Sequence, residues 1–155
     1  MSILKQGFNM LERRFWLVFL FTTFLAFPLQ AKSFPDNFIK LEPGTSYEGQ
    51  LNPKEVMRFY FVLERGMDVV LESHTSLKRT NNVYPGAVLF HADGSVITRD
   101  WNGGQGRNFK ISRRLEAGTY VLRVEDGRGC GSLHGCPEII KDFTLTFEVE
   151  EISPF

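Results

Sequence analysis

Apolar and polar residues alternate along much of the chain after residue 31. In the segment 57–64, Met, Phe, Phe and Leu alternate with Arg, Tyr, Val and Glu, and the segments 119–124 and 143–150 follow the same rule. A period of two places one set of side chains on a buried face and the other set on the opposite face of a strand. The inward set is predicted to form the core: Phe59, Phe61, Tyr120, Leu122, Phe143, Leu145 and Phe147.

Shorter apolar segments separated by turn residues predict the remaining strands. They cover residues 46–51, 68–73, 87–91, 96–100 and 108–112. Asp93-Gly94 lies between two of them and is typical of a hairpin, because glycine tolerates a positive φ. No segment after residue 31 keeps a helical period. About eight short strands predict an all-β fold, a single antiparallel β-sandwich of the jelly-roll type.

The first 31 residues have the pattern of a secretory signal peptide. Lys5, Arg13 and Arg14 precede an uncharged apolar run at 15–28, and Leu29-Gln30-Ala31 ends in a small residue. The alternative is a membrane anchor, but a spanning helix needs about 20 apolar residues. Translation could also begin at Met10. Cleavage after Ala31 leaves a domain at 32–155, which is long enough to close one core, in the periplasm or outside the cell.

Charge narrows the classes of partner. Without the first 31 residues the chain carries a slight excess of acidic residues, and its adjacent basic pairs are Lys78-Arg79 and Arg113-Arg114. Nucleic acids and anionic membranes favour clustered positive charge. We therefore expect neither as a partner, and no stable membrane span.

Two cysteines lie close together in the exported part. Cys130 and Cys136 are expected to form a disulfide, because exported proteins meet an oxidising environment. His134 lies between them, so zinc is the alternative, but a structural zinc site needs a fourth ligand. No metal or cofactor is expected.

Motifs for catalysis are absent from the sequence. It contains neither a Gly-x-Ser-x-Gly elbow nor a His-Glu-x-x-His motif. Ser132 lies two residues before His134, but neighbours on a short loop do not make a triad. The protein is therefore expected not to be an enzyme.

Three long connections are the candidate binding segments. They span residues 75–85, 101–107 and 125–141, and loops of this size on a rigid sandwich often carry binding residues. If they share one end of the sandwich, their aromatic and arginine side chains can anchor a partner; the alternative for Trp101 is that it caps the core. The predicted partner-binding residues are Trp101, Arg107, Tyr84, Arg79, Asn81, Asn82 and His134.

A series of short motifs carries a family resemblance. In chain order they are Gly44-x-x-Tyr47-x-Gly49-x-Leu51, Arg58-Phe59-Tyr60-Phe61, Gly66-Met67-Asp68-Val69, 88–94 (VLFHADG), 117–124 (AGTYVLRV) and 143–147 (FTLTF). Together they resemble the bacterial pre-peptidase C-terminal domain over about residues 38–151. That family is a β-sandwich on secreted proteases, related to collagen-binding modules. Where some members carry metal-binding aspartates, this chain has Tyr84-Pro85-Gly86-Ala87.

The chain is also similar to the stand-alone periplasmic inhibitors of g-type lysozyme. The likeness lies in its size, its signal segment and the pattern Gly118-x-Tyr120-x-x-Arg123-Val124; its two cysteines and the Trp101 loop depart from theirs. These resemblances imply an exported binding protein, most specifically an inhibitor of a peptidoglycan hydrolase such as a lysozyme. The alternative is an accessory module that binds polysaccharide or extracellular matrix protein.

Overall fold

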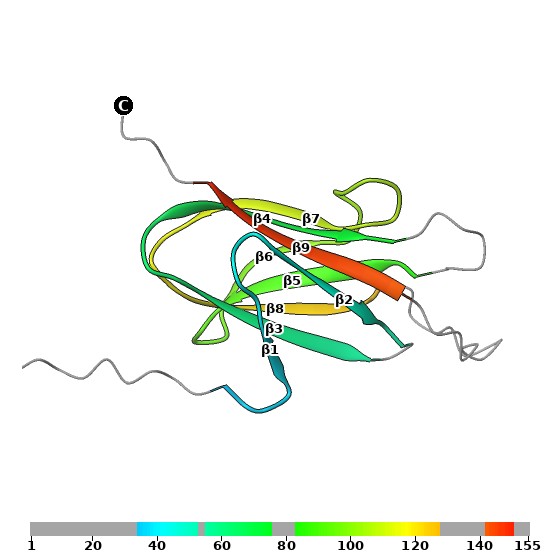
Figure 1. Cartoon of the computed structure of the whole chain (residues 1–155), viewed down its shortest axis with the longest axis horizontal. Coiled ribbons are helices and arrows are strands. Elements are labelled where there is room, and N and C mark those ends of the chain that lie inside the picture. Colours follow the sequence, from blue (N-terminus) through cyan, green and yellow to red (C-terminus); the bar gives the residue numbers. More distant parts are fainter. Residues whose placement is uncertain (1–33, 53–54, 76–82, 128–141, 151–155) are drawn as a thin grey trace, which may run out of the picture. The chain divides into compact units, whose positions relative to one another are not determined.

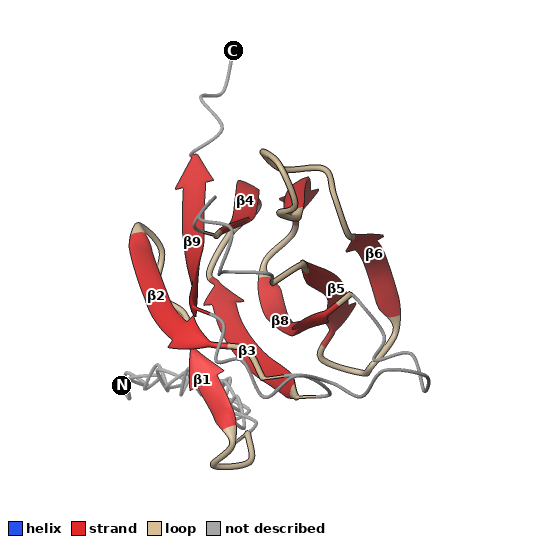
Figure 2. Cartoon of the chain, turned by 90° about the vertical axis from the view of Figure 1, so that its right-hand side faces the viewer, coloured by secondary structure: helices blue, strands red, loops and turns tan. Residues whose placement is uncertain are grey.

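Two β-sheets lie face to face in the computed structural model, which describes residues 34–52, 55–75, 83–127 and 142–150 (Figures 1 and 2). All described residues belong to one compact unit, Ser33–Phe155. They form nine strands and no helix, which confirms the predicted all-β sandwich. The predicted signal segment at 1–31 lies outside the described residues.

The strands divide into a five-stranded and a four-stranded sheet. The first has the order β1 (Phe38–Lys40), β3 (Val56–Leu63), β8 (Gly118–Asp126), β5 (Pro85–His91) and β6 (Val96–Asp100). The second has the order β2 (Thr45–Gln50), β9 (Asp142–Glu150), β4 (Met67–His74) and β7 (Lys110–Leu115). Neighbouring strands are antiparallel except β1 and β3, which pair in parallel.

The core lies between the two sheets and contains every residue predicted for it. Phe59, Phe61, Tyr120, Leu122, Phe143, Leu145 and Phe147 are all buried. The ring centroid of Phe61 lies 4.6 Å from that of Phe147 on the opposite sheet and 5.4 Å from that of Tyr120 on its own sheet. The period-two pattern thus placed the correct side chains inward.

The hairpin predicted at Asp93-Gly94 is confirmed. Gly94 has a φ of +91°, and Asp93 Oδ1 accepts hydrogen bonds from the Ser95 amide (2.8 Å) and hydroxyl (2.6 Å). These bonds hold the pKa of the Asp93 carboxyl below its usual value. The turn joins the end of β5 to the start of β6. The start of β5 lies at the other end of the sandwich.

Strand pairing brings the borders of the three long connections to one end of the sandwich. The start of β5 lies beside the end of β8, where Pro85 pairs with Asp126, and the end of β6 lies there as well, because Ala87 pairs with Asp100. The end of β4 lies beside the starts of β9 and β7. Figure 1 shows these strand ends on its right-hand side. The connections themselves are described at 75, 83–84, 101–109 and 127.

Candidate functional site

Two aromatic rings and an arginine gather at this end. Arg107 Cζ lies 4.3 Å from the ring centroid of Tyr84, which is cation–π geometry. Trp101 lies against Gly86 and Gly127 and keeps 43 % of its surface exposed. The Gly127 amide donates to the Tyr84 carbonyl oxygen at 2.7 Å. The backbone against which Trp101 lies is therefore hydrogen-bonded to Tyr84. We call Tyr84, Trp101 and Arg107 the aromatic end.

Glycines make the position of Trp101 possible. A Cβ added at Gly86 would lie 1.7 Å from Cε3 of Trp101, and one added at Gly127 would lie 3.2 Å from the same atom. The indole therefore lies flat against backbone that carries no side chain. This placement differs from the alternative in which Trp101 caps the core, since Trp101 is not part of the core cluster.

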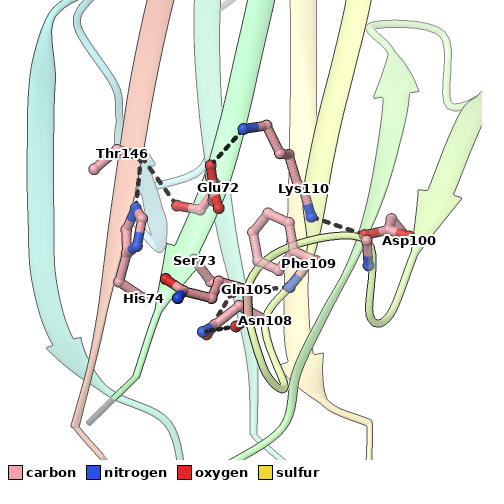
Figure 3. Close-up of polar contacts among 10 residues, drawn as sticks. Glu72, Ser73, His74, Asp100, Gln105, Asn108, Phe109, Lys110 and Thr146 are labelled. Atoms are coloured by element: carbon pink, nitrogen blue, oxygen red, sulfur yellow. Dashed lines mark hydrogen bonds and ion pairs between the residues drawn. The ribbon is translucent and has the colours of Figure 1, made fainter. Parts of the chain in front are cut away.

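Asp100 fixes the start of the loop that carries Trp101 and Arg107. Its Oδ2 atom accepts hydrogen bonds from the amides of Gly103 (2.8 Å) and Lys110 (2.7 Å), and so joins the two ends of the loop (Figure 3). Lys110 begins β7 of the other sheet, and its ammonium pairs with Glu72 Oε2 at 2.9 Å. The Asp100 carboxylate, at the end of β6, therefore links the edge strand β6 of one sheet to the edge strand β7 of the other.

A buried amide fixes the end of the loop. Asn108 Nδ2 donates to the Gln105 carbonyl oxygen at 2.8 Å, and its Oδ1 accepts from the Ser73 hydroxyl at 3.2 Å. The Ser73 hydroxyl oxygen accepts in turn from the Phe109 amide at 3.1 Å (Figure 3). Ser73 and Asn108 are the buried polar residues of the described chain, and both serve this loop. Hydrogen bonds thus hold both ends of the loop that carries Trp101 and Arg107.

We expect Asn108→Ala to lower the free energy of unfolding by about 1–3 kcal/mol, because it leaves buried polar groups without partners. Urea denaturation measures the change. Asn52→Ala is the matched control, since the Asn52 amide bonds Glu55 on the surface and should cost at most about 0.5 kcal/mol. Equal losses for the two variants would contradict this role of Asn108.

The structure brings three of the predicted binding residues together and leaves the others undescribed. Trp101, Arg107 and Tyr84 form the aromatic end. The remaining predictions lie outside the described residues: Arg79, Asn81, Asn82, His134 and the cysteines Cys130 and Cys136.

Sequence reasoning missed the residues that shape the site. Gly86 and Gly127 seat Trp101, and Asp126 Oδ1 accepts from the Tyr84 amide at 3.3 Å. Their signal was present, because a glycine inside a strand often marks a close approach of another group. The predicted loop boundaries also need correction: Pro85 begins β5, and Glu125 and Asp126 end β8, since antiparallel pairing extends both strands.

A hollow lies at the opposite end of the sandwich from the aromatic end. It is an open hollow of about 560 Å³ between the 92–95 and 116–118 turns, with His91, Asp93, Glu116 and Tyr120 among its lining residues. Its Asp93 carboxylate is occupied by Ser95, and the Tyr120 hydroxyl donates to the Glu116 carbonyl oxygen at 2.8 Å. Burial raises the pKa of Tyr120. The Asp93 carboxylate and the Tyr120 hydroxyl are therefore already engaged in hydrogen bonds within this end of the sandwich.

Within the described segments, no three His, Cys, Asp or Glu side chains gather in a way that could hold a metal ion. The described residues include no helix that is long and apolar enough to span a membrane.

Comparison with known proteins identifies the fold. No family profile and no curated protein sequence matches the chain. Among solved structures, the pre-peptidase C-terminal domain of a collagenase from Bacillus anthracis matches 75 % of this chain and 99 % of its own, with a TM-score of 0.56 and 13 % identity. The periplasmic inhibitors of g-type lysozyme from Aeromonas hydrophila and Salmonella Typhimurium match 74 % of this chain and 96 % and 99 % of their own. Their TM-scores are 0.49 and 0.42, at 9 % and 13 % identity. The chain has the fold of the pre-peptidase C-terminal domain, as its motifs indicated.

Proposed function

We propose that this chain is a non-catalytic, exported binding protein that holds a protein partner through the aromatic end, and that the partner is a peptidoglycan hydrolase of the lysozyme type. The observation that carries the proposal is the grouping of Trp101 and Arg107, on a loop that hydrogen bonds tie at both ends, with Tyr84 immediately before β5. The resemblance of the sequence motifs to inhibitors of g-type lysozyme supports the choice of partner.

The chemistry of the aromatic end suits an interface. Trp, Tyr and Arg dominate the binding energy of protein interfaces, and they do so most effectively when little freedom is lost on binding. Trp101 is backed by bare backbone, and the Arg107 guanidinium is oriented by the Tyr84 ring. Both side chains are therefore presented in defined positions before a partner arrives.

A hydrolase cleft offers the matching groups. Enzymes that cleave glycosidic bonds use a pair of carboxyl groups flanking the scissile bond. A guanidinium brought to such a cleft gains from the negative charge, and the indole gains from apolar contact. Occupation of the cleft would block the enzyme without any chemistry by the inhibitor.

The second candidate is an accessory module that binds a polymer. It is favoured by the collagenase that carries the similar domain, and by Trp101, whose exposed indole could stack on a sugar ring. The two candidates differ in what they retain: an inhibitor binds a soluble enzyme at one equivalent, whereas a module binds insoluble polysaccharide or collagen.

One panel of binding measurements separates the candidates. The exported protein is titrated with g-type, c-type and i-type lysozymes and with peptidoglycan, chitin and collagen. We expect affinity for a lysozyme, and a loss of at least about tenfold on Trp101→Ala and on Arg107→Ala. Glu148→Ala, an exposed position of β9 on the outer face of the other sheet, is the control and should bind as the wild type does. Binding to polymers alone would establish the second candidate, and binding to neither group would refute both.

Export makes a prediction of its own. Protein recovered from the periplasm or the medium should have the mass of residues 32–155, less two hydrogens, and should take up no thiol label when denatured without reductant. The first result follows from cleavage after Ala31, and the second from a bridge between Cys130 and Cys136. Intact mass spectrometry measures both. Retention of residues 15–28 in a membrane fraction, or labelling of both thiols, would contradict them.

A further inference from the structure

The outer face of the five-stranded sheet carries a row of arginines beside a row of apolar side chains. Strand register places Arg58 of β3 opposite Arg123 of β8, and Val88 of β5 between Arg123 and Arg99 of β6. The next row, in the order of the strands, contains Tyr60, Val121, Phe90 and Val96. We call these two rows, with Val62 of β3, the arginine face.

The exposed large hydrophobic residues of the described chain lie on this face or at its margin. Val62, Val96 and Trp101 are the exposed large hydrophobic residues of the described chain, at 48 %, 45 % and 43 %. Val62 and Val96 belong to the arginine face, and Trp101 covers Gly86 at its margin. Phe34 extends the patch, because its ring stacks on Tyr60 at 4.4 Å between centroids. Exposed apolar side chains gathered on one face of a sheet are typical of interaction sites.

Among the described residues, one carboxylate forms an ion pair with the arginines of this face, and it is that of Glu125. Arg58 and Arg123 are direct cross-strand neighbours, an arrangement that destabilises a sheet when the charges are alike. Arg123 pairs with Glu125 at 3.2 Å, whereas neither Arg58 nor Arg99 forms an ion pair with a described residue. A carboxylate supplied from outside would relieve the repulsion.

The outer face of the four-stranded sheet is mainly acidic. Its outward positions contain Glu48, Asp68, Glu72, Asp142, Glu148 and Glu150, and Lys110 and Arg114 of β7 lie opposite Glu72 and Asp68. Val70 is the apolar residue among the outward positions of β4. The described exposed residues Val62 and Val96 therefore lie with arginines on the face of the five-stranded sheet, whereas Arg114 on the other face lies opposite the acidic Asp68.

We propose that the arginine face docks a second protein, at a surface where carboxylates are surrounded by apolar side chains. The carboxylates would meet Arg58, Arg123 and Arg99, and the apolar groups would pack on Phe90, Val96 and Val62. Arginine with aromatic and aliphatic groups is the composition of an interface centre, and the aliphatic side chains gain little from a sugar or a nucleic acid. A second copy of this chain fits less well, since joining the arginine face to the acidic face is a heterologous contact, which leads to rings or open filaments rather than to a closed two-fold dimer.

This inference is independent of the proposed function, because it requires no hydrolase. The test uses a phage-displayed library of random 16-residue peptides, selected on the immobilised exported protein. The selected peptides should combine Asp or Glu with aromatic or aliphatic residues. Arg58→Glu should weaken their binding at least tenfold, as should Arg99→Glu. Glu148→Lys is the matched control, a charge reversal on the opposite face, and should leave their affinity within twofold of the wild type.

Folding of the variants is checked in the same experiment. Arg58→Glu replaces a like-charge pair with an attractive one beside Arg123, so its melting temperature should equal or exceed that of the wild type. Loss of binding in a stable variant then reports on the surface alone. Selected peptides without an excess of acidic residues, or peptides that bind Arg58→Glu as well as the wild type, would overturn the proposal. Sedimentation of the wild type as a multimer that Arg58→Glu disperses would also overturn it, because the occupant would then be a second copy.

Discussion

Replacing Phe61 with alanine is expected to lower the free energy of unfolding by about 3–5 kcal/mol. Phe61 has no exposed surface and lies at the centre of the sandwich. Its ring contacts Phe147 across the two sheets and Tyr120 on the neighbouring strand. Truncation to a methyl group removes buried apolar contact from both sheets and leaves a cavity that rigid strands cannot close.

Chemical denaturation of the protein measures the loss. Val62→Ala is the control, since the next residue of β3 points outward and is 48 % exposed, and it should cost at most about 0.5 kcal/mol. A domain of this size has a total stability of roughly 5–15 kcal/mol. Phe61→Ala should therefore remove a substantial part of the total stability, and a loss below about 1 kcal/mol would be incompatible with the described core.

Replacing Gly86 with alanine is expected to displace Trp101 and to abolish partner binding with little loss of stability. The added methyl group would lie 1.7 Å from Cε3 of the indole, so the ring must move. Trp101 is the single tryptophan after residue 31, and its fluorescence therefore reports on the site alone once the signal segment is removed. The emission should shift to the red, because the ring moves from its contact with the glycine backbone into water.

The matched control is Gly118→Ala at the opposite end of the sandwich. A Cβ there meets its nearest neighbour at 3.6 Å, which is ordinary contact, so both emission and binding should stay as in the wild type. If Gly86→Ala leaves the emission unchanged, Trp101 does not lie against Gly86. If the emission shifts and binding persists, the indole is not the anchor of the partner.

The strands were predictable because alternation depends on local sequence. The inward positions of β3, β8 and β9 are marked by uninterrupted period-two patterns, and Asp93-Gly94 marks its own turn. β1 was not predicted, since three residues are too few to show a period, and its parallel pairing with β3 leaves no local trace.

The side chains of the aromatic end were predictable from the sequence, but the contacts that hold them in place were not. Aromatic and arginine residues in a glycine-rich loop pointed to Trp101 and Arg107, and the structure places both with Tyr84. The supporting contacts join residues far apart in the chain, such as Ser73 with Asn108, or Trp101 with Gly127. Such contacts follow from the packing of two sheets, which no local pattern encodes.

The measurement that tests the central proposal most directly is a titration of g-type lysozyme with the protein, with lysis of bacterial cell walls as the readout. We predict that lysis falls in proportion to added protein and ceases near one equivalent, while Trp101→Ala at the same concentration leaves it running. A stoichiometric end point distinguishes a tight inhibitor from a weak surface binder. Undiminished lysis at a tenfold excess of the wild-type protein would contradict the proposal.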